Sequence, residues 1–374
     1  MKNKKILVLY QDWNNWFMNN YSKFEHWFKD KDGAYDENNK YYILSLGNFN
    51  DILYPEFNIT VEIFKSSPVT QLFDLIKFKK RLKEIIEEFK PDYIYVPFLY
   101  LGSTIPKGYS NFKVISFLRD ITAEMVKAKG GIRKIFGNLF YFLDYLALKN
   151  TDILLYNSPY LENYAKKLGY KKKLIFNPRT ITDKEYFEKA DGNKVIKKYN
   201  LEEKKVILTV ARLTKEKNIE MGIKALKYLP EEYVYVIVGE GPEKENLKKL
   251  CKKLNVKDRV IFTGFVEHKY IWDYYKAADI FWLLSKSNFE GIPNVILESW
   301  YAKVPIIVSK IDALSFIKNE VTGLVLKSWK EKELAKKTNF LLNNPKTYQK
   351  LCDFGYKEVT SIIKKHIHIK DLFV

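Results

Sequence analysis

The chain is 374 residues long, with 47% apolar and 29% charged side chains and a formal net charge of +19. These proportions exclude wholesale disorder and are typical of a soluble globular protein, and the length suits two ordinary domains. Two cysteines exclude a disulfide framework and fit a reducing compartment, and no apolar run reaches the roughly 18 residues that a membrane-spanning helix needs. We therefore expect a cytoplasmic protein.

The strong positive charge favours anionic partners. The excess of Lys and Arg is spread about evenly over the two halves of the chain and does not form one stripe. We expect no nucleic-acid partner, and we favour a phosphorylated substrate or an acidic membrane surface, because diffuse positive charge attracts both.

In the first half, short apolar runs alternate with amphipathic helical stretches, which is the pattern of a parallel α/β domain. The first run, ILVLY, is too short for the core of a signal peptide and is interpreted as the first strand. Strands are predicted near 5–10, 41–46, 60–64, 93–97, 113–118 and 152–156, and helices near 70–89, 130–149 and 159–168.

The α/β pattern restarts at KKVILTVARL, residues 204–213, and continues to VPIIVS. The link between the two halves lies near 174–187. We predict an N-terminal domain over 1–182 and a C-terminal domain over 183–354. A last helix, about 355–374, has no strand of its own to cover and is expected to cross back to the first domain.

Three loops that follow strands in the second half carry unusual residues, and ligands of open parallel sheets bind beyond the carboxyl ends of the strands. In the first loop, VARLTKEKN, Arg212 ends a strand and Lys217 precedes the next helix. A guanidinium fork and an ammonium group suit a diphosphate. The alternative is a solvated helix start.

The second loop, VGEGPEKENL, places Gly-x-Gly after a strand. Lys244 stands where a dinucleotide-binding motif would have its third glycine. A tight turn with Pro242 at the start of a helix therefore fits these residues better.

The third loop, SNFEGIPNVILES, carries two glutamates in apolar surroundings. Pro293 fits the first turn of a helix, whose N-terminus can bind an anion, and Gly291 allows a close backbone approach to a ligand. Glu290 at the mouth of the loop and Glu298 on the helix can face one ligand with a phosphate group between two hydroxyl-bearing parts. The alternative for Glu298 is a structural salt bridge to a Lys or Arg.

The segments that together carry a family resemblance are ARLTKEKN, GEGPEKENLKKLCKKL, RVIFTGFV, AADIFWLLSKSNFEGIPNVILES and VPIIVS. Over about residues 203–326, the chain closely resembles the family 4 (GT4) retaining glycosyltransferases. The resemblance implies an α/β protein of GT-B fold, in which two Rossmann-like parallel-sheet domains face a cleft. The first half matches the family only loosely.

The resemblance also implies roles for single residues. Arg212 and Lys217 would bind the diphosphate of the donor, Glu290 the hydroxyls of the donor sugar, and Glu298 the ribose. The other implied donor-site positions are Gly291, Ile292, Pro293, Asn294, Gly239 and Gly264. Enzymes of this family need no bound metal or other cofactor, and the Asp-x-Asp at 30–32 is interpreted as a solvated loop.

On the acceptor side the sequence departs from the family. The segment QDWNNWF replaces a glycine-rich loop, so Trp13 is expected to shape the acceptor side. In SFLRD, Arg119 stands in the place of a family histidine, before Asp120. In the second half, Lys303 stands where the family usually has a glycine.

We therefore predict a retaining, metal-independent glycosyltransferase. It would move a sugar from a nucleotide-sugar, with UDP favoured, to a glycan or lipid-linked acceptor in cell-surface polysaccharide or glycan biosynthesis. Basic residues ahead of the aromatic-rich stretch 130–150 suggest contact with an anionic membrane on its inner face, and the alternative is a core helix. Two other classes stay open: a nucleotide-sugar epimerase of GT-B fold, and a basic nucleic-acid-binding protein.

Overall fold

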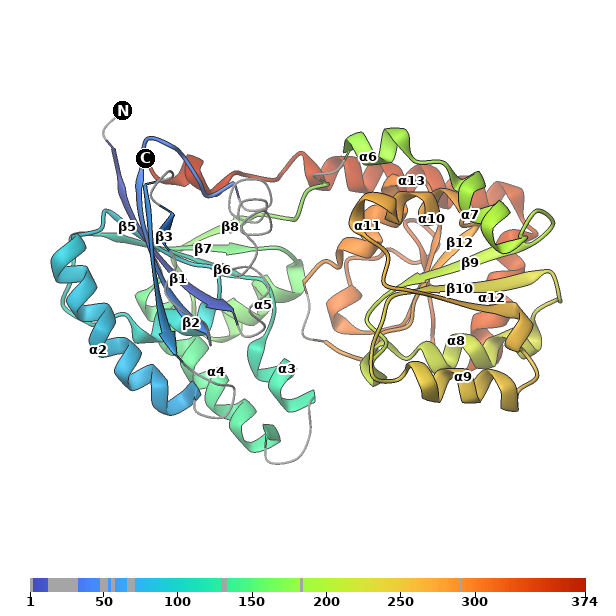
Figure 1. Ribbon diagram of the computed structural model, residues 1–374, viewed down its shortest axis with the longest axis horizontal. Coiled ribbons are helices and arrows are strands. Elements are labelled where there is room, and N and C mark those ends of the chain that lie inside the picture. Colours follow the sequence, from blue (N-terminus) through green and yellow to red (C-terminus); the bar gives the residue numbers. More distant parts are fainter. Residues whose placement is uncertain are drawn as a thin grey trace. The chain divides into compact units, whose positions relative to one another are not determined.

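The computed structural model describes residues 3–12, 33–47, 53–54, 58–65, 71–128, 133–181, 184–288 and 291–374. The chain divides into two compact units (Figure 1). The first unit combines Met1–Arg179 with Lys365–Val374, and the second is Thr180–Lys364. The sequence had placed the boundaries after residues 182 and 354.

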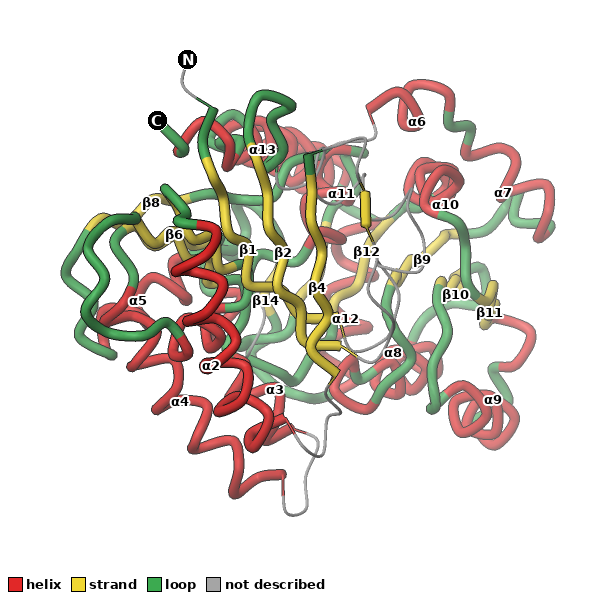
Figure 2. The backbone as a smooth tube through the Cα atoms, turned by 60° about the vertical axis from the view of Figure 1, so that its left-hand side comes forward, coloured by secondary structure: helices red, strands yellow, loops and turns green. Residues whose placement is uncertain are grey.

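The first unit is built on one sheet with the strand order β3-β4-β2-β1-β5-β6-β7-β8. Its strands are β1 Lys5–Asp12, β2 Lys40–Gly47, β3 Leu53–Tyr54, β4 Ile59–Lys65, β5 Tyr93–Val96, β6 Lys113–Leu118, β7 Ile153–Tyr156 and β8 Lys173–Phe176. All neighbours pair in parallel except β3 with β4. Figure 2 shows β1, β2 and β4 side by side. The short strands β3 and β8 were not predicted.

Both faces of this sheet are apolar, as expected for a buried parallel sheet. Leu7 and Leu9 of β1 face a core that includes side chains of α2, α4 and α5, whereas Ile6 and Val8 face a second core. The helices of this unit are α2 Gln71–Phe89, α3 Thr122–Ala128, α4 Arg133–Asn150 and α5 Pro159–Lys167, with a 3-10 helix, η3, at Leu99–Thr104.

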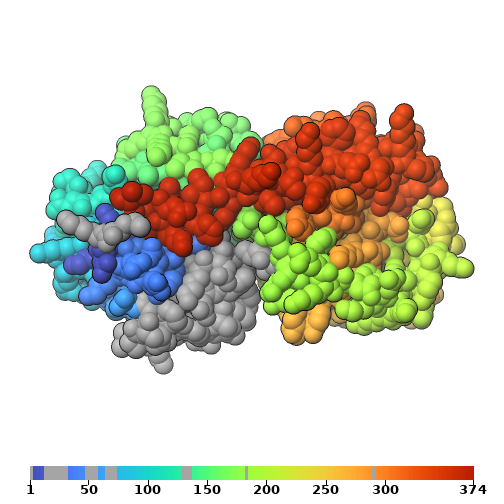
Figure 3. All heavy atoms as spheres, turned by 90° about the horizontal axis from the view of Figure 1, so that it is seen from above, coloured from blue at the N-terminus to red at the C-terminus, as the bar shows by residue number. Residues whose placement is uncertain are grey.

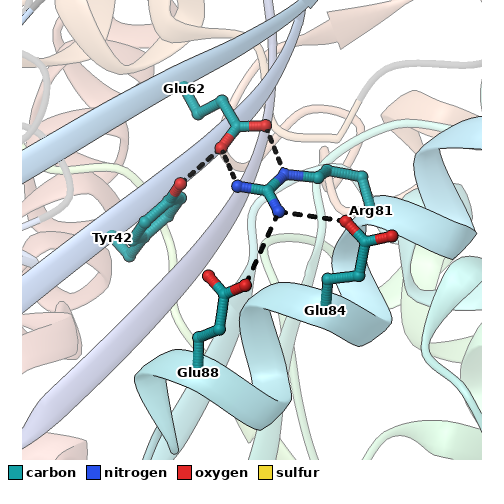
Figure 4. Close-up of polar contacts among 5 residues, drawn as sticks. All are labelled: Tyr42, Glu62, Arg81, Glu84 and Glu88. Carbon is teal, nitrogen blue, oxygen red and sulfur yellow. Dashed lines mark hydrogen bonds and ion pairs between the residues drawn. The ribbon is translucent and has the colours of Figure 1, made fainter.

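A polar network fixes helix α2 to the sheet (Figure 4). Arg81 on α2 donates from Nε and Nη2 to the two carboxylate oxygens of Glu62 on β4, both at 2.8 Å. Glu62 also accepts from the hydroxyl of Tyr42 on β2, and Arg81 pairs with Glu84 at 3.0 Å. This bidentate geometry orients α2 along the strands as well as adding attraction.

The last ten residues complete the second core of the first unit. Ile369, in the 3-10 helix η9 (Ile369–Leu372), and Phe373 are buried there. Asn177 and Ile367 exchange two hydrogen bonds of 2.9 and 3.1 Å, which join this segment to the end of β8. Figure 3 shows the segment in red against the blue N-terminal part of the same unit.

The second unit holds a parallel six-stranded sheet with the order β11-β10-β9-β12-β13-β14. Its strands are β9 Lys205–Val210, β10 Tyr233–Val238, β11 Val260–Gly264, β12 Ile280–Leu283, β13 Ile306–Val308 and β14 Leu324–Val325. Its α-helices are α6 Lys184–Lys189, α7 Gly192–Tyr199, α8 Ile219–Ala225, α9 Lys244–Lys253, α10 Ile271–Ala277, α11 Asn294–Tyr301, α12 Glu331–Leu342 and α13 Pro345–Ile363. Helix α13 lies wholly in this unit, and the part of the C-terminus that joins the first unit begins at Lys365.

The strand order of the second unit reverses between β9 and β12. From β9 the chain steps outward through β10 and β11, and it then returns to the other side of β9 with β12, β13 and β14. Loops that leave adjacent strands in opposite directions open a crevice at the carboxyl ends, where ligands of such sheets bind. The loop that carries Arg212 and Lys217 leaves β9, and the loop that leads to Glu298 leaves β12.

Within the described ranges, no helix is both long enough and apolar enough to cross a membrane.

Candidate functional site

The loops after β9 and β12 are hydrogen-bonded to each other. The backbone N–H of Lys286 donates to the carbonyl of Glu216 at 2.8 Å, and the hydroxyl of Ser285 lies 3.3 Å from the same oxygen. Glu216 belongs to the 3-10 turn η4, Lys215–Lys217. The structure thus fixes the loop that carries Arg212 and Lys217 beside the loop that leads to α11.

A third loop joins the same edge of the sheet. After β13, the hydroxyl of Ser309 donates to the carbonyl of Ser285 at 2.5 Å. The backbone N–H of Ala313 donates to Asn288 Oδ1 at 3.2 Å. The loops after β9, β12 and β13 are therefore joined by hydrogen bonds of the backbone and of short polar side chains, which gives a preorganised rim.

The Gly-x-Gly loop after β10 supports the Arg212 loop through its backbone. A Cβ atom on Gly239, where φ is +132°, would lie 2.0 Å from the carbonyl oxygen of Ala211. A Cβ on Gly241 would lie 2.4 Å from that of Leu213. Only glycine permits this approach. The backbone N–H of Leu213 donates to the carbonyl of Glu240 at 2.9 Å.

The motif lacks a third glycine. Lys244 stands at that position and forms an ion pair of 2.6 Å with Glu240. Gly264, at the end of β11 with φ +77°, accepts a hydrogen bond from the N–H of Gly239 at 2.9 Å. The tight-turn interpretation agrees with this geometry, and a contact of Gly239 or Gly264 with a donor stays a prediction.

The two predicted diphosphate ligands lie on one short loop. Arg212 is exposed, and within the described ranges its guanidinium has no ion pair. Lys217 is half-buried, and its N–H donates to the carbonyl of Thr214 at 3.1 Å. The loop ends at Asn218, whose φ of +51° turns the chain into α8. The diphosphate role of Lys217 and the alternative of a solvated helix start both stay predictions.

Glu298 lies on α11 with only 9% of its surface exposed. Its Oε2 accepts a hydrogen bond of 2.8 Å from the hydroxyl of Tyr275, on α10. Its Oε1 lies 3.7 Å from Nε2 of His268, which comes from the loop after β11. The predicted alternative, a salt bridge to Lys or Arg, is absent from the described residues. Sequence reasoning missed both actual neighbours.

The start of α11 agrees with the predicted helix, shifted by one residue. Pro293 occupies the position before the helix, with φ −67°, and the N–H of Ile296 donates to its carbonyl at 3.1 Å. Gly291 and Ile292 are buried. The buried Oδ1 of Asn294 has no hydrogen-bond partner within the described part of the chain. Glu290 lies outside the described residues.

On the predicted acceptor side, Arg119 and Asp120 follow the end of β6 in the first unit. Arg119 donates to the hydroxyl of Tyr95 at 3.1 Å, and its guanidinium lies 4.3 Å from the ring centre of Phe117. Asp120 accepts from the hydroxyl of Thr122 at 3.3 Å. Trp13 lies outside the described residues.

Asp144, on α4 of the same unit, was not among the predicted site residues. Its carboxyl is 1% exposed and accepts a hydrogen bond of 2.7 Å from the hydroxyl of Tyr164. Burial, and to a smaller degree the charge of Asp120, raises the pKa of Asp144 to about 7. An acidic residue inside the apolar run LFYFLDYLAL was the available signal, and the same signal had drawn attention to Glu298.

Solved structures share this fold. The structure of HepE from Anabaena in complex with UDP matches with a TM-score of 0.73 and 17% identity over 98% of each chain. The same protein was also solved with UDP-glucose. WaaG, a glycosyltransferase of lipopolysaccharide biosynthesis, matches with a TM-score of 0.68 and 14% identity over 99% of each chain. The chain therefore has the GT-B class of fold, as predicted.

Sequence comparison finds a family that the second unit resembles. Residues 191–358 match the model of the family described as glycosyl transferases group 1. This match covers most of the second unit and less than half of the chain.

Two relatives illustrate the match. The chain is 27% identical to α-D-kanosaminyltransferase of Streptomyces kanamyceticus over 160 residues, 42% of this chain and 41% of that protein. It is also 32% identical to a Campylobacter jejuni α-1,4-N-acetyl-D-galactosaminyltransferase that is named for a PP-undecaprenol-linked glycan. This match spans 191 residues, which are 50% of this chain and 48% of that protein. The chain thus spans about half the length of the curated relatives it matches.

Proposed function

We propose that the protein is a retaining glycosyltransferase that uses a nucleotide-sugar and acts in polysaccharide or glycan biosynthesis. The observation that carries the proposal is the rim at the switch point of the second unit. There the loop with Arg212 and Lys217 is hydrogen-bonded to the loop that leads to Glu298. The match to the glycosyl transferases group 1 model and the names of the relatives support the same activity.

We propose that the donor is a UDP-sugar, with Arg212 and Lys217 on the diphosphate and Glu298 on the ribose. Two cations five positions apart on a loop fixed by Gly239 and Gly241 suit a diphosphate. A nearly buried carboxylate is suited to accept hydrogen bonds from ribose hydroxyls. The HepE complexes with UDP and UDP-glucose support this choice of nucleotide.

In the proposed mechanism, the leaving diphosphate departs on the face that the acceptor hydroxyl attacks, so the sugar keeps its anomeric configuration. A phosphate oxygen of the leaving group takes the acceptor proton, so no side-chain base is required. Arg212, Lys217 and the N-terminus of α11 stabilise the charge that develops on the diphosphate. We propose that the reaction needs no bound metal.

We propose a glycan or lipid-linked acceptor bound by the first unit, at the inner face of a membrane. One side of α4 supports this: Leu139, Phe142 and Tyr145, spaced three residues apart, are exposed on one face of the helix. The ammonium of Lys149 lies 4.4 Å from the ring centre of Tyr145. The opposite side of the helix, with Phe140 and Ala147, packs in the core.

A thermal-shift screen with UDP, GDP and ADP tests the proposal. Saturating ligand should raise the melting temperature with one of them, since ligand at a hundredfold excess over its Kd stabilises a protein by ~2.7 kcal/mol. The UDP-sugar should then yield free UDP and a glycosylated product with a suitable acceptor. Epimerisation of the free nucleotide-sugar, with no transfer, would place the protein in the epimerase class. No response to any nucleotide would contradict the proposal.

A further inference from the structure

Two neighbouring helices of the second unit bring Tyr275 and Glu298 together. Tyr275 lies on α10 and is fully buried, and Glu298 lies on α11 at 9% exposure. The phenol hydroxyl donates to Glu298 Oε2 at 2.8 Å. A carboxylate that is nearly buried and accepts a hydrogen bond from a rigid aromatic side chain has its rotamer fixed.

The hydroxyl has one stronger and one weaker acceptor. Besides Glu298, it lies 3.4 Å from the carbonyl oxygen of Val295 in the first turn of α11. Burial, and next the charge of Glu298, raises the pKa of Tyr275 well above its ordinary value. The phenol therefore keeps its proton and remains a hydrogen-bond donor at neutral pH.

The two oxygens of Glu298 have different surroundings. Oε2 is bound to the buried phenol, whereas Oε1 lies on the side of the loop after β11, 3.7 Å from Nε2 of His268. That distance is longer than a hydrogen bond. The side chain of His268 is 52% exposed and that of Glu298 is 12% exposed, so Oε1 has an exposed neighbour where Oε2 has a buried one.

We infer that Tyr275 is a positioning residue for the nucleotide ribose: it holds Oε2 of Glu298 so that Oε1 accepts a ribose hydroxyl. The inference rests on the proposed function, in which Glu298 contacts the ribose. Tyr275 itself touches no ligand. Without its hydroxyl, the carboxylate loses its buried partner and can turn toward His268 or solvent.

The test compares nucleotides with and without ribose hydroxyls. Binding of UDP, GDP and ADP, and of their 2′,3′-dideoxy counterparts, is measured by calorimetry. Wild type should prefer the ribonucleotide by about 10-fold, the effect of one hydrogen bond to a charged group. Tyr275→Phe should reduce this preference to about 2-fold, and Glu298→Ala should abolish it.

Two controls separate positioning from damage to the fold. Tyr274→Phe removes the hydroxyl of the adjacent residue, which lies 3.3 Å from the hydroxyl of Tyr199, and should keep the full preference. Inorganic pyrophosphate should bind wild type and Tyr275→Phe equally, because the Arg212 loop is unchanged.

The outcomes distinguish the inference from the proposed function. If wild type binds no ribonucleotide, the proposed function fails. If Glu298→Ala keeps the preference, the ribose assignment and the inference both fail. If Glu298→Ala loses the preference but Tyr275→Phe retains all of it, the inference alone is overturned.

Discussion

Glu298 and Asp144 each lie inside an apolar helix, and each is paired with a tyrosine from a neighbouring helix. Glu298 accepts from Tyr275, and Asp144 accepts from Tyr164. Asp144 is the more deeply buried of the two, at 1% exposure, and has no ion-pair partner among the described residues. Burying a charge without a counterion is costly, so a buried carboxyl tends to keep its proton.

Asp144 should make the stability of the protein depend on pH. Its pKa is about 7 in the folded protein against 3.8 for an ordinary aspartate, so the folded state binds the proton more tightly. The free energy of unfolding should therefore fall as pH rises through this window, by on the order of 3 kcal/mol. Asp144→Asn, which can still accept from Tyr164, should flatten the dependence in urea titrations at pH 5 and pH 8.

The matched control is Asp353→Asn, because Asp353 is exposed on α13. It should leave the pH dependence of wild type unchanged. An Asp144→Asn variant that loses as much stability as wild type between pH 5 and pH 8 would show that Asp144 is charged at neutral pH.

Among the elements, helix α4 is apolar on both sides. Phe140 and Ala147 belong to the core, and Leu139, Phe142 and Tyr145 are exposed. A core helix and a membrane-contacting helix were the two alternative predictions for this stretch. The exposed fractions of the α4 side chains are compatible with both roles at once. An exposed aromatic stripe beside a lysine suits an anionic lipid interface.

Phe142→Ser should weaken binding to anionic vesicles several-fold in co-sedimentation, because it removes apolar surface without disturbing the core. Phe340→Ser is the control, since Phe340 is similarly exposed on α12 of the second unit. The vesicles should contain phosphatidylglycerol. Equal sedimentation of both variants, or no binding by wild type, would remove the membrane proposal.

The C-terminal segment acts as part of the first unit although it is distant in sequence. Ile369→Ala should lower the free energy of unfolding by about 2–4 kcal/mol, because this side chain is fully buried against the sheet. Val374→Ala, at a position that is 86% exposed, should change it by less than about 0.5 kcal/mol. Urea denaturation measures the free energy of unfolding of both variants. Equal losses in Ile369→Ala and Val374→Ala would mean that the segment does not contribute to this core.

At the scale of the whole molecule, the sequence predicted the two α/β units and, in the second, the order of elements from β9 to β13. Alternating apolar runs are local signals, and each run such as VILTV or YVYVIV specifies its own strand. The two-residue strand β3 is too short to leave an apolar pattern, and the residues of β8 fall at the start of the predicted link between the two halves. Both segments are strands because they pair with a neighbouring strand, and the local sequence does not specify that pairing.

The candidate site was predictable in part. Residue type and spacing indicated Arg212, Lys217 and Glu298, but not that Tyr275 and His268 would meet Glu298 from other elements. Such contacts depend on how the helices pack. The backbone at Lys303 is different, because a local signal was present. Lys303 stands where the resembling family usually has glycine, and the chain adopts the left-handed conformation there, with φ +58°.

The most direct test of the central claim is a calorimetric titration with UDP. Wild type should bind it, and Lys217→Ala should bind about 10- to 100-fold more weakly, as expected for the loss of one charged hydrogen bond. Lys215→Ala, on the exposed side of the same turn, should bind as wild type does. Equal binding of UDP by wild type and Lys217→Ala, or no binding of UDP, GDP or ADP by wild type, would contradict the account.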